Sequence, residues 1–248
     1  MNQQSVSSKK RIVVVIPAYE AADTLPLVLS RIPPRVYDAL FSILIVEDAN
    51  PQIPRSVTPD LQIKYPKIEV LVRDQAGYGG AQKKGFRRAL ELGCDIAVLL
   101  HADGQYAPEI MEELYAPLLG DKADIVLGSR MKNYRSALRG RMPFYKFVAN
   151  ICLTKIENLV YGLNLSEYHS GYMLYSRKAL ETIPFEKLSD AFHYDGEMLL
   201  VGGKKKLRIA DVPIPTHYGN EESHVKPISY GFEVLGVVLK YFRGKYDY

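Results

Sequence analysis

The chain has 248 residues, of which 47% are apolar and 24% are charged. This composition is typical of a globular protein and excludes a disordered or fibrous chain. The formal net charge of +4 is weaker than the clustered basic excess of most nucleic-acid-binding proteins. We therefore expect no nucleic acid partner, and instead an anionic ligand or an anionic membrane surface.

No stretch of the sequence reaches the roughly 18 apolar residues that a membrane-spanning helix requires. The polar N-terminus runs directly into a short apolar segment, which predicts a strand and not a signal peptide. Cys94 and Cys152 lie in separate apolar stretches, a pattern that predicts two buried thiols and no disulfide framework. These features together predict a cytoplasmic, reducing location.

The first half of the chain alternates strand patterns with helical patterns. Apolar, β-branched runs predict strands over 12–16, 41–46, 68–72, 96–100 and 125–127. Helical periodicity covers 24–32 and 79–92, whereas prolines make 50–65 a loop with at most a short helix. Such alternation predicts an α/β fold with a mostly parallel sheet and helices on both faces.

The second half is less regular. Helical patterns cover 143–163, 194–201 and 229–242, and strand patterns cover 170–175 and 207–212. The helix over 143–163 is apolar around most of its circumference. Its narrow polar stripe consists of Lys146, Asn150, Thr154 and Glu157. With no internal repeat and no linker-like segment, the sequence predicts a single domain over 1–248.

Five polar or glycine-rich loops follow the predicted strands. They are 17–20 (Pro-Ala-Tyr-Glu), 47–50 (Glu-Asp-Ala-Asn), 74–80 (Asp-Gln-Ala-Gly-Tyr-Gly-Gly), 101–105 (His-Ala-Asp-Gly-Gln) and 128–130 (Gly-Ser-Arg). Ligands of parallel α/β sheets bind at the carboxyl ends of the strands. Five such loops therefore predict one composite site.

The loop after the fourth predicted strand carries candidate metal ligands. Asp103 can hold a divalent ion against a diphosphate, since Mg²⁺ typically takes one or two protein carboxylates plus phosphate oxygens. His101 and Gln105 lie two residues to either side, and imidazole suits Mn²⁺ better than Mg²⁺. The alternative interpretation is a plain turn in which Asp103 only ends a strand.

The other loops suit a nucleotide. Glu47 and Asp48 can bind a ribose or a base, and Tyr19 and Glu20 offer a stacking ring and a carboxylate. The alternative for each pair is a solvated turn or a helix entry. The glycine loop 77–80 departs from the dinucleotide fingerprint and lacks the Gly-Lys-Ser/Thr of a Walker loop. Its glycines allow the backbone to approach a ligand closely.

In this order, the loops resemble those of family-2 glycosyltransferases of the GT-A fold, and most of all the polyprenyl- and dolichyl-phosphate sugar synthase branch. The resemblance covers roughly residues 11–225. The matching segments are 15–20, 45–48, 79–85, 101–108, 127–130, 169–172 and 212–216. It implies a GT-A (Rossmann-like) domain with a nucleotide-sugar half over about 11–130 and an acceptor half over about 131–248.

The resemblance also implies roles for individual residues. The nucleotide would be held by Pro17, Tyr19, Glu20, Glu47, Asp48, Gln75, Gly79, Ala102 and Asp103. Mn²⁺ or Mg²⁺ would be held by Asp103, Gln105, His101 and His217. The acceptor phosphate would be bound by Arg130, Arg139 and Arg141, and the catalytic candidates are Asp195, Glu197 and Arg130. The chain departs from the family pattern at His101, where the motif has aspartate. Synthases of this branch often carry membrane helices after the domain; the sequence ends at Tyr248 without one, which argues against a lipid acceptor unless the sequence is a fragment.

The implied reaction is inverting transfer of a sugar from a UDP- or GDP-linked donor to a polyprenyl phosphate. A hydroxyl acceptor would need a general base, Asp195, whereas a phosphate needs only cations to position it. Transfer to a soluble or glycan hydroxyl, and nucleotide-sugar binding without turnover, are the alternatives. The segment 143–163 would contact the inner face of the membrane peripherally, or else be a core helix or a contact in a homo-oligomer.

Overall fold

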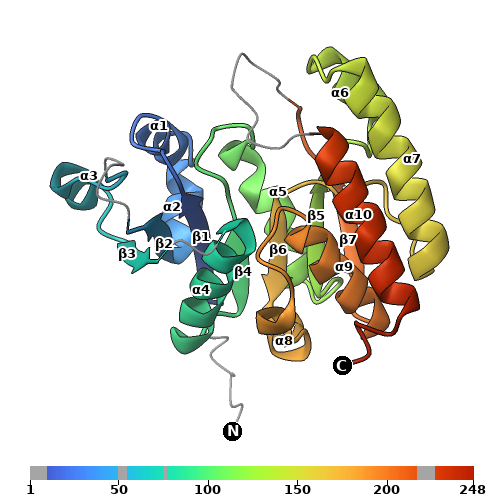
Figure 1. Ribbon diagram of the computed structural model, residues 1–248. Helices are drawn as coiled ribbons and strands as arrows, with labels where there is room; N and C mark the ends of the chain where they lie inside the picture. Colours follow the sequence, from blue (N-terminus) through green and yellow to red (C-terminus); the bar gives the residue numbers. More distant parts are fainter. Residues whose placement is uncertain (1–9, 50–54, 75–76, 217–226) are drawn as a thin grey trace, which may run out of the picture.

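The computed structural model describes residues 10–49, 55–74, 77–216 and 227–248. A seven-stranded sheet in the order β3-β2-β1-β4-β6-β5-β7 forms its centre (Figure 1). The strands are β1 Ile12–Ala18, β2 Leu40–Asp48, β3 Ile68–Arg73, β4 Ile96–Leu99, β5 Ile125–Ser129, β6 Met173–Ser176 and β7 Ile209–Pro213. The α/β class and the mostly parallel sheet predicted from the sequence are confirmed.

One strand runs against the others. β6 is antiparallel to both β4 and β5, and all the remaining pairs are parallel. This strand was predicted over 170–175, and in the structure it begins only at Met173. Because of its reversed direction, β6 starts at the edge where its neighbours end. The segment before Met173 is thereby brought to the carboxyl edge of the sheet.

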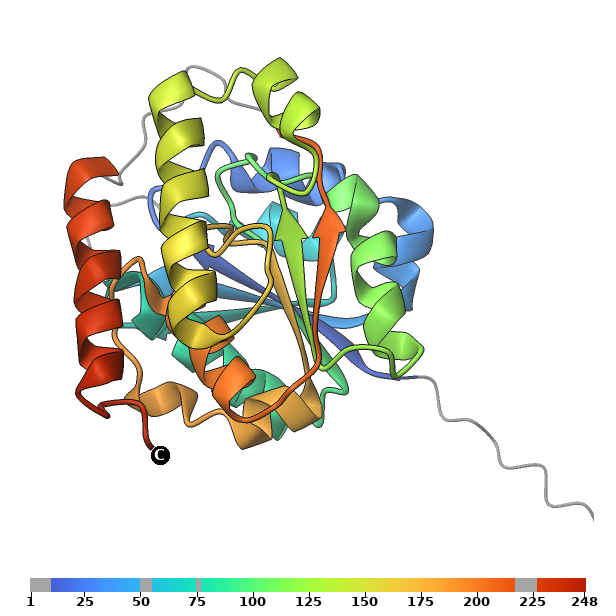
Figure 2. The same cartoon turned by 90° about the vertical axis from the view of Figure 1, so that its right-hand side faces the viewer.

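Helices cover both faces of the sheet (Figures 1 and 2). One face packs against α4 Gly77–Glu91, α8 Arg177–Thr182, α9 Tyr194–Lys204 and α10 Pro227–Phe242. The other face packs against α1 Leu25–Ser30, α2 Pro34–Ala39, α3 Pro59–Lys64 and α5 Met111–Leu119. Val13 and Val15 of β1 point to the first face, and Val14 and Ile16 point to the second. This double burial explains the unbroken apolar run.

The helices α6 Tyr134–Arg139 and α7 Phe144–Tyr161 stand at the side of the sheet, and α10 packs against α7 (Figure 2). Short 3-10 turns, η1 Pro108–Ile110 and η2 Phe185–Lys187, complete the described elements. None of the described helices is long and apolar enough to span a membrane.

The orientation of α7 is inverted relative to an ordinary surface helix. Its polar residues Asn150, Thr154 and Glu157 are buried, whereas Phe144 is 73% exposed and Leu159 is 85% exposed. Cys152 also lies on the exposed side, so the prediction that this thiol is buried was wrong, while Cys94 is buried as expected. A polar stripe that is buried must contact polar groups of the protein, because unpaired polar atoms are costly away from water.

Candidate functional site

The carboxyl ends of β1 and β2 form a pocket lined by Ala18, Tyr19, Glu20, Glu47, Asp48, Arg55 and Ser56. The parallel register places Ala18 beside Glu47, so the two predicted nucleotide loops are neighbours. Tyr19 and Glu20 are exposed at this pocket. Glu20 has φ of 50°, a left-handed conformation that is uncommon for a residue other than glycine and that clusters at functional sites.

Two of the three acids that line this pocket, Glu47 and Asp48, have partners in the surrounding structure. Glu47 is buried and accepts hydrogen bonds from the backbone N–H groups of Ser56 at 2.7 Å and Val57 at 3.0 Å. Asp48 forms an ion pair of 2.8 Å with Arg73, and both side chains are less than one-tenth exposed. Glu47 therefore shapes the pocket wall, and Asp48 enters any nucleotide contact as one half of an ion pair.

The loop after β4 exposes the carboxylate of Asp103 to solvent. Asp103 is exposed, and its Oδ1 accepts a hydrogen bond of 3.0 Å from the backbone N–H of Gln105. Gly104 between them has φ of 78°, which favours glycine at the tip of this turn. The structure thus keeps Asp103 and Gln105 together at the carboxyl edge.

A divalent ion fits this loop only with ligands from a substrate. No group of three or more His, Cys, Asp and Glu side chains among the described residues is arranged to hold a metal. One carboxylate beside a diphosphate is nevertheless a common arrangement for Mg²⁺. Gln75 and His217 lie outside the described residues. Ala102 is buried beside Asp103, and Pro17 is partly buried at the end of β1.

Tyr78 connects two of the predicted residues. Its hydroxyl donates a hydrogen bond of 2.6 Å to Oδ2 of Asp195 and lies 2.9 Å from Nε2 of His101. Burial raises the pKa of Asp195 above its ordinary value, although the hydrogen bond from Tyr78 opposes this shift. Burial and the charge of Asp195 also raise the pKa of Tyr78 well above its usual range.

Glu197 lies apart from this group, although it is only two residues from Asp195. Successive helical positions point in different directions, and Glu197 accepts hydrogen bonds from the backbone N–H of Ser189 at 2.8 Å and from the hydroxyl of Tyr246 at 2.5 Å. It therefore fastens the C-terminal segment to α9. Gly79 packs against the backbone of Ser189, the residue whose N–H donates to Glu197.

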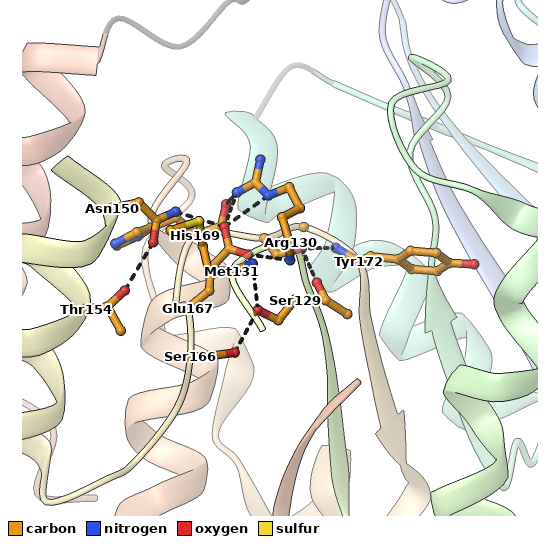
Figure 3. Close-up of polar contacts among 12 residues, drawn as sticks. Ser129, Arg130, Met131, Asn150, Thr154, Ser166, Glu167, His169 and Tyr172 are labelled. Atoms are coloured by element: carbon orange, nitrogen blue, oxygen red, sulfur yellow. Dashed lines mark hydrogen bonds and ion pairs between the residues drawn. The ribbon is translucent and has the colours of Figure 1, made fainter. Parts of the chain in front are cut away.

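Arg130 follows β5 and is held by a buried acid (Figure 3). Glu167 has no exposed surface and accepts hydrogen bonds from the backbone N–H of Arg130 at 2.9 Å and from its Nε at 3.0 Å. Asn150 of α7 donates to the same carboxylate at 2.9 Å. Burial alone would raise the pKa of Glu167, but the charge and hydrogen bonds of Arg130 hold it below its usual value.

The polar stripe of α7 therefore serves this network. Thr154 donates to the side chain of Asn150 at 3.2 Å, and Glu157 lies 3.2 Å from Nε2 of His169. The backbone carbonyl of His169 in turn accepts from the guanidinium of Arg130 at 2.6 Å. Arg139 and Arg141, by contrast, are exposed at the end of α6.

Sequence reasoning missed Tyr78 and Glu167. Tyr78 stands inside a glycine loop, where the glycines drew attention to the backbone and not to the side chain. Glu167 stands just before the matched segment 169–172, and its only local signal is an acid between two apolar runs. Both are recognised only when the sheet brings distant segments together.

Comparison with known proteins agrees with this architecture. The family model "Glycosyl transferase family 2" matches residues 13–184. A UDP-N-acetylglucosamine–dolichyl-phosphate N-acetylglucosaminyltransferase from Methanococcus voltae is 30% identical over 95% of this chain and 98% of its own. An undecaprenyl-phosphate mannosyltransferase from Micrococcus luteus is 30% identical over 82% of each chain.

Among solved structures, glucosyl-3-phosphoglycerate synthase from Mycobacterium tuberculosis, crystallised with Mn²⁺, UDP and phosphoglyceric acid, has a similar fold. The TM-score is 0.65 with 16% identity, over 93% of this chain and 78% of that one. At this identity the likeness concerns the fold alone.

Proposed function

Because the chain belongs to glycosyltransferase family 2 and is a glycosyltransferase, we propose that it transfers a sugar from a nucleoside diphosphate donor to a polyprenyl phosphate. The observation that carries this proposal is the similarity to the Methanococcus voltae enzyme, which extends over almost the full length of both chains. Since the name of that relative includes UDP, a UDP-linked sugar is the first donor to test, and a GDP-linked sugar is the second.

The donor would occupy the pocket at the ends of β1 and β2, with its diphosphate towards the loop after β4. Tyr19 is exposed beside the pocket and can stack on the base, while Glu20 can accept from ribose hydroxyls. Asp103 would hold Mn²⁺ or Mg²⁺ against the diphosphate, with Gln105 beside it. When bound, such an ion offsets charge on the leaving nucleoside diphosphate.

The acceptor phosphate would attack the anomeric carbon from the face opposite the leaving group. A bond forms between a phosphate oxygen and this carbon, and the bond to the donor diphosphate breaks, with inversion. Because the phosphate is already an anion, no proton has to be removed. Arg139 and Arg141 are exposed cations that can bind it bidentately. Arg130, tied to Glu167, positions the wall formed by the segment around His169.

A polyprenyl acceptor lies in a membrane, and the surface of α7 and α10 suits contact with one. Large apolar side chains are exposed on both helices, including Phe144 at 73%, Leu159 at 85% and Phe232 at 71%. Arg139 and Arg141 lie just before α7 and can meet lipid phosphates. We propose peripheral membrane contact through this surface, whereas a homo-oligomer contact would cover the same side chains.

The test is a transfer assay with radiolabelled UDP- and GDP-sugars and polyprenyl phosphate in anionic vesicles. We expect label in the organic phase only when both donor and lipid phosphate are present. Label transferred only to a soluble hydroxyl compound would contradict the lipid acceptor and favour the alternative in which Asp195 is the base. Nucleotide-sugar binding without transfer to any acceptor would contradict turnover altogether.

A further inference from the structure

We infer that Tyr78 and Asp195 form a hydrogen-bond relay that fixes the tautomer of His101, so that Asp195 is a positioning residue for the donor site and not a general base. The inference rests on the proposed function, because it assigns His101 to the donor diphosphate and its divalent ion. It concerns a position at which this chain departs from the family pattern: the family has aspartate there, and this chain has His101.

Three elements bring the relay together. Tyr78 is in the first turn of α4, His101 lies two residues after the end of β4, and Asp195 is in the first turn of α9. The hydroxyl of Tyr78 stands between the other two, 2.6 Å from Oδ2 of Asp195 and 2.9 Å from Nε2 of His101. Both distances are those of normal hydrogen bonds.

Counting protons decides the direction of each bond. When Asp195 is ionised its carboxylate only accepts, so the single hydroxyl proton of Tyr78 is donated to Asp195. The oxygen of Tyr78 must then accept from His101, which requires the proton of a neutral imidazole to be on Nε2. The other ring nitrogen, Nδ1, is left with a free lone pair.

Packing holds the ring of His101 in this place. A Cβ atom on Gly171 would lie 2.5 Å from both Cε1 and Nε2 of His101, so only glycine fits there. The ring of Tyr106 meets His101 edge-on, with centroids 5.1 Å apart. The ring of Phe192 stacks on Tyr78 at 5.3 Å. Rotation of either relay ring would therefore require neighbouring groups to move.

The tautomer matters because it decides what His101 can bind. A lone pair on Nδ1 can bind a divalent ion or accept a hydrogen bond, whereas a protonated Nδ1 can do neither. Metal-binding histidines commonly donate their other N–H to a carboxylate, and mutation of that partner typically lowers metal affinity or activity about 10–100-fold. Here Tyr78 would connect the imidazole to the carboxylate of Asp195.

The same contacts make Asp195 a poor general base. Asp195 is only 5% exposed: its Oδ2 accepts from the hydroxyl of Tyr78, and its Oδ1, which has no hydrogen-bond partner among the described residues, is buried as well. A general base must reach the proton that it removes. A phosphate acceptor would need no base, which is consistent with a positioning role for this acid.

The first experiment reads the tautomer directly in the protein without metal or nucleotide. Long-range proton–nitrogen NMR spectra of ¹⁵N-histidine-labelled protein report which ring nitrogen carries the proton, and His101→Asn identifies the signal of His101. We expect protonation at Nε2 in the wild type and a mixture of tautomers in Tyr78→Phe. An unchanged signal in Tyr78→Phe would overturn the relay.

The second experiment measures Mn²⁺ binding in the presence of UDP by electron paramagnetic resonance. Tyr78→Phe and Asp195→Asn should each weaken Mn²⁺ binding about 10–100-fold. Tyr115→Phe, at a tyrosine of α5 on the other face of the sheet, is the matched control and should bind normally. In a His101→Asp background, Tyr78→Phe should have no further effect, because a carboxylate has no tautomer to fix.

Two results would overturn the inference. An equal loss of Mn²⁺ binding in both backgrounds would show that Tyr78 acts only on the structure. Loss of sugar transfer in Asp195→Asn with unchanged Mn²⁺ binding and an unchanged His101 tautomer would identify Asp195 as the base. Neither measurement of binding uses an acceptor, so failure of the lipid-acceptor proposal is a distinct outcome.

Discussion

Arg130 donates hydrogen bonds to the carboxylate of Glu167 from both its backbone and its guanidinium, and Glu167 has no exposed surface. The pair joins the end of β5 to the segment that enters β6. Asn150 extends it to α7. The end of β5, the segment that enters β6, and α7 enclose the proposed acceptor side, and all three are joined through the buried carboxylate of Glu167.

Glu167→Gln should destabilise the protein strongly. The change leaves the guanidinium of Arg130 poorly compensated in a position where its side chain is only 14% exposed. Breaking a buried ion pair in this way typically costs about 3–5 kcal/mol. Urea denaturation measures the loss, and Glu181→Gln is the control because its pair with Arg177 is about half exposed and should contribute at most about 1 kcal/mol. Equal losses in the two variants would contradict a structural role for Glu167.

Asp103→Asn should lower turnover at least about a hundredfold, because a lost metal contact removes several kcal/mol of charge stabilisation. Steady-state rates at saturating Mn²⁺ measure the effect, and chelation with EDTA should abolish wild-type activity. Asp121→Asn is the control, because that exposed acid pairs with Lys10. Full wild-type activity in EDTA would exclude a metal-bound diphosphate.

Replacing Arg139 and Arg141 together with alanine should raise the Michaelis constant for polyprenyl phosphate and leave UDP affinity unchanged. Both arginines are exposed, so the fold should be unaffected. The effect should decrease as salt rises, because exposed charges are screened. Arg177→Ala on α8 removes an exposed arginine elsewhere and serves as the control. A change in UDP affinity by calorimetry would place these arginines at the donor.

Leu159→Glu and Phe232→Glu should each weaken binding to anionic vesicles. Burying such a side chain is worth about 1.5–3 kcal/mol, so a roughly 10-fold or larger loss is expected for each. Leu27→Glu is the matched control, since Leu27 is 64% exposed on α1 and lies outside the α7–α10 surface. Co-sedimentation measures binding. If the variants changed the oligomeric state and not vesicle binding, the surface would be a subunit contact.

Asp124 should make folding stability depend on acid pH. Its hydrogen bonds from Arg208 at 3.0 Å and Lys178 at 3.2 Å hold the pKa of this buried carboxyl well below its ordinary value. A lowered folded pKa stabilises the protein above the unfolded value of about 3.9, and this stability is lost as pH falls towards the folded pKa. The free energy of unfolding should therefore fall more between pH 6 and about pH 3 in the wild type than in Asp124→Asn. If the free energy of unfolding fell equally with pH in the wild type and in Asp124→Asn, Asp124 would not be the source of the pH dependence.

The sheet could be predicted because its central strands are buried on both faces. Residues 12–16 had to be apolar at every position, and this leaves a plain signal in the sequence. The direction of β6 could not be predicted, because it depends on pairing with β4 and β5, both far away in the chain. The helices α2, α5, α6 and α8 were missed; α2, α6 and α8 have only six residues, which carry little periodicity, and α5 has nine.

That the loops after β1 and β2 lie side by side could be predicted for the same reason. Strand ends identify the loops, but the partners of Asp48 and Glu47 come from Arg73 and the loop at 55–57. These pairs form only when the fold brings the residues together, so no motif of fixed spacing in the sequence indicates them. The polar stripe of α7 was recognised in the sequence, whereas its inward orientation follows only from the position of Glu167.

The reversed strand also has a consequence for the order in which the chain can fold during synthesis. In the described structure, β5 pairs with β6 and β7, and one edge of β4 is covered by β6. At about 5–20 residues per second, several seconds pass on the ribosome between completion of β4 and the appearance of Met173. During this interval β4 has an open edge of the kind that promotes aggregation. A fragment ending at residue 130 would keep that edge and an unpaired β5, so the predicted nucleotide-sugar half is expected to need the acceptor half in order to fold.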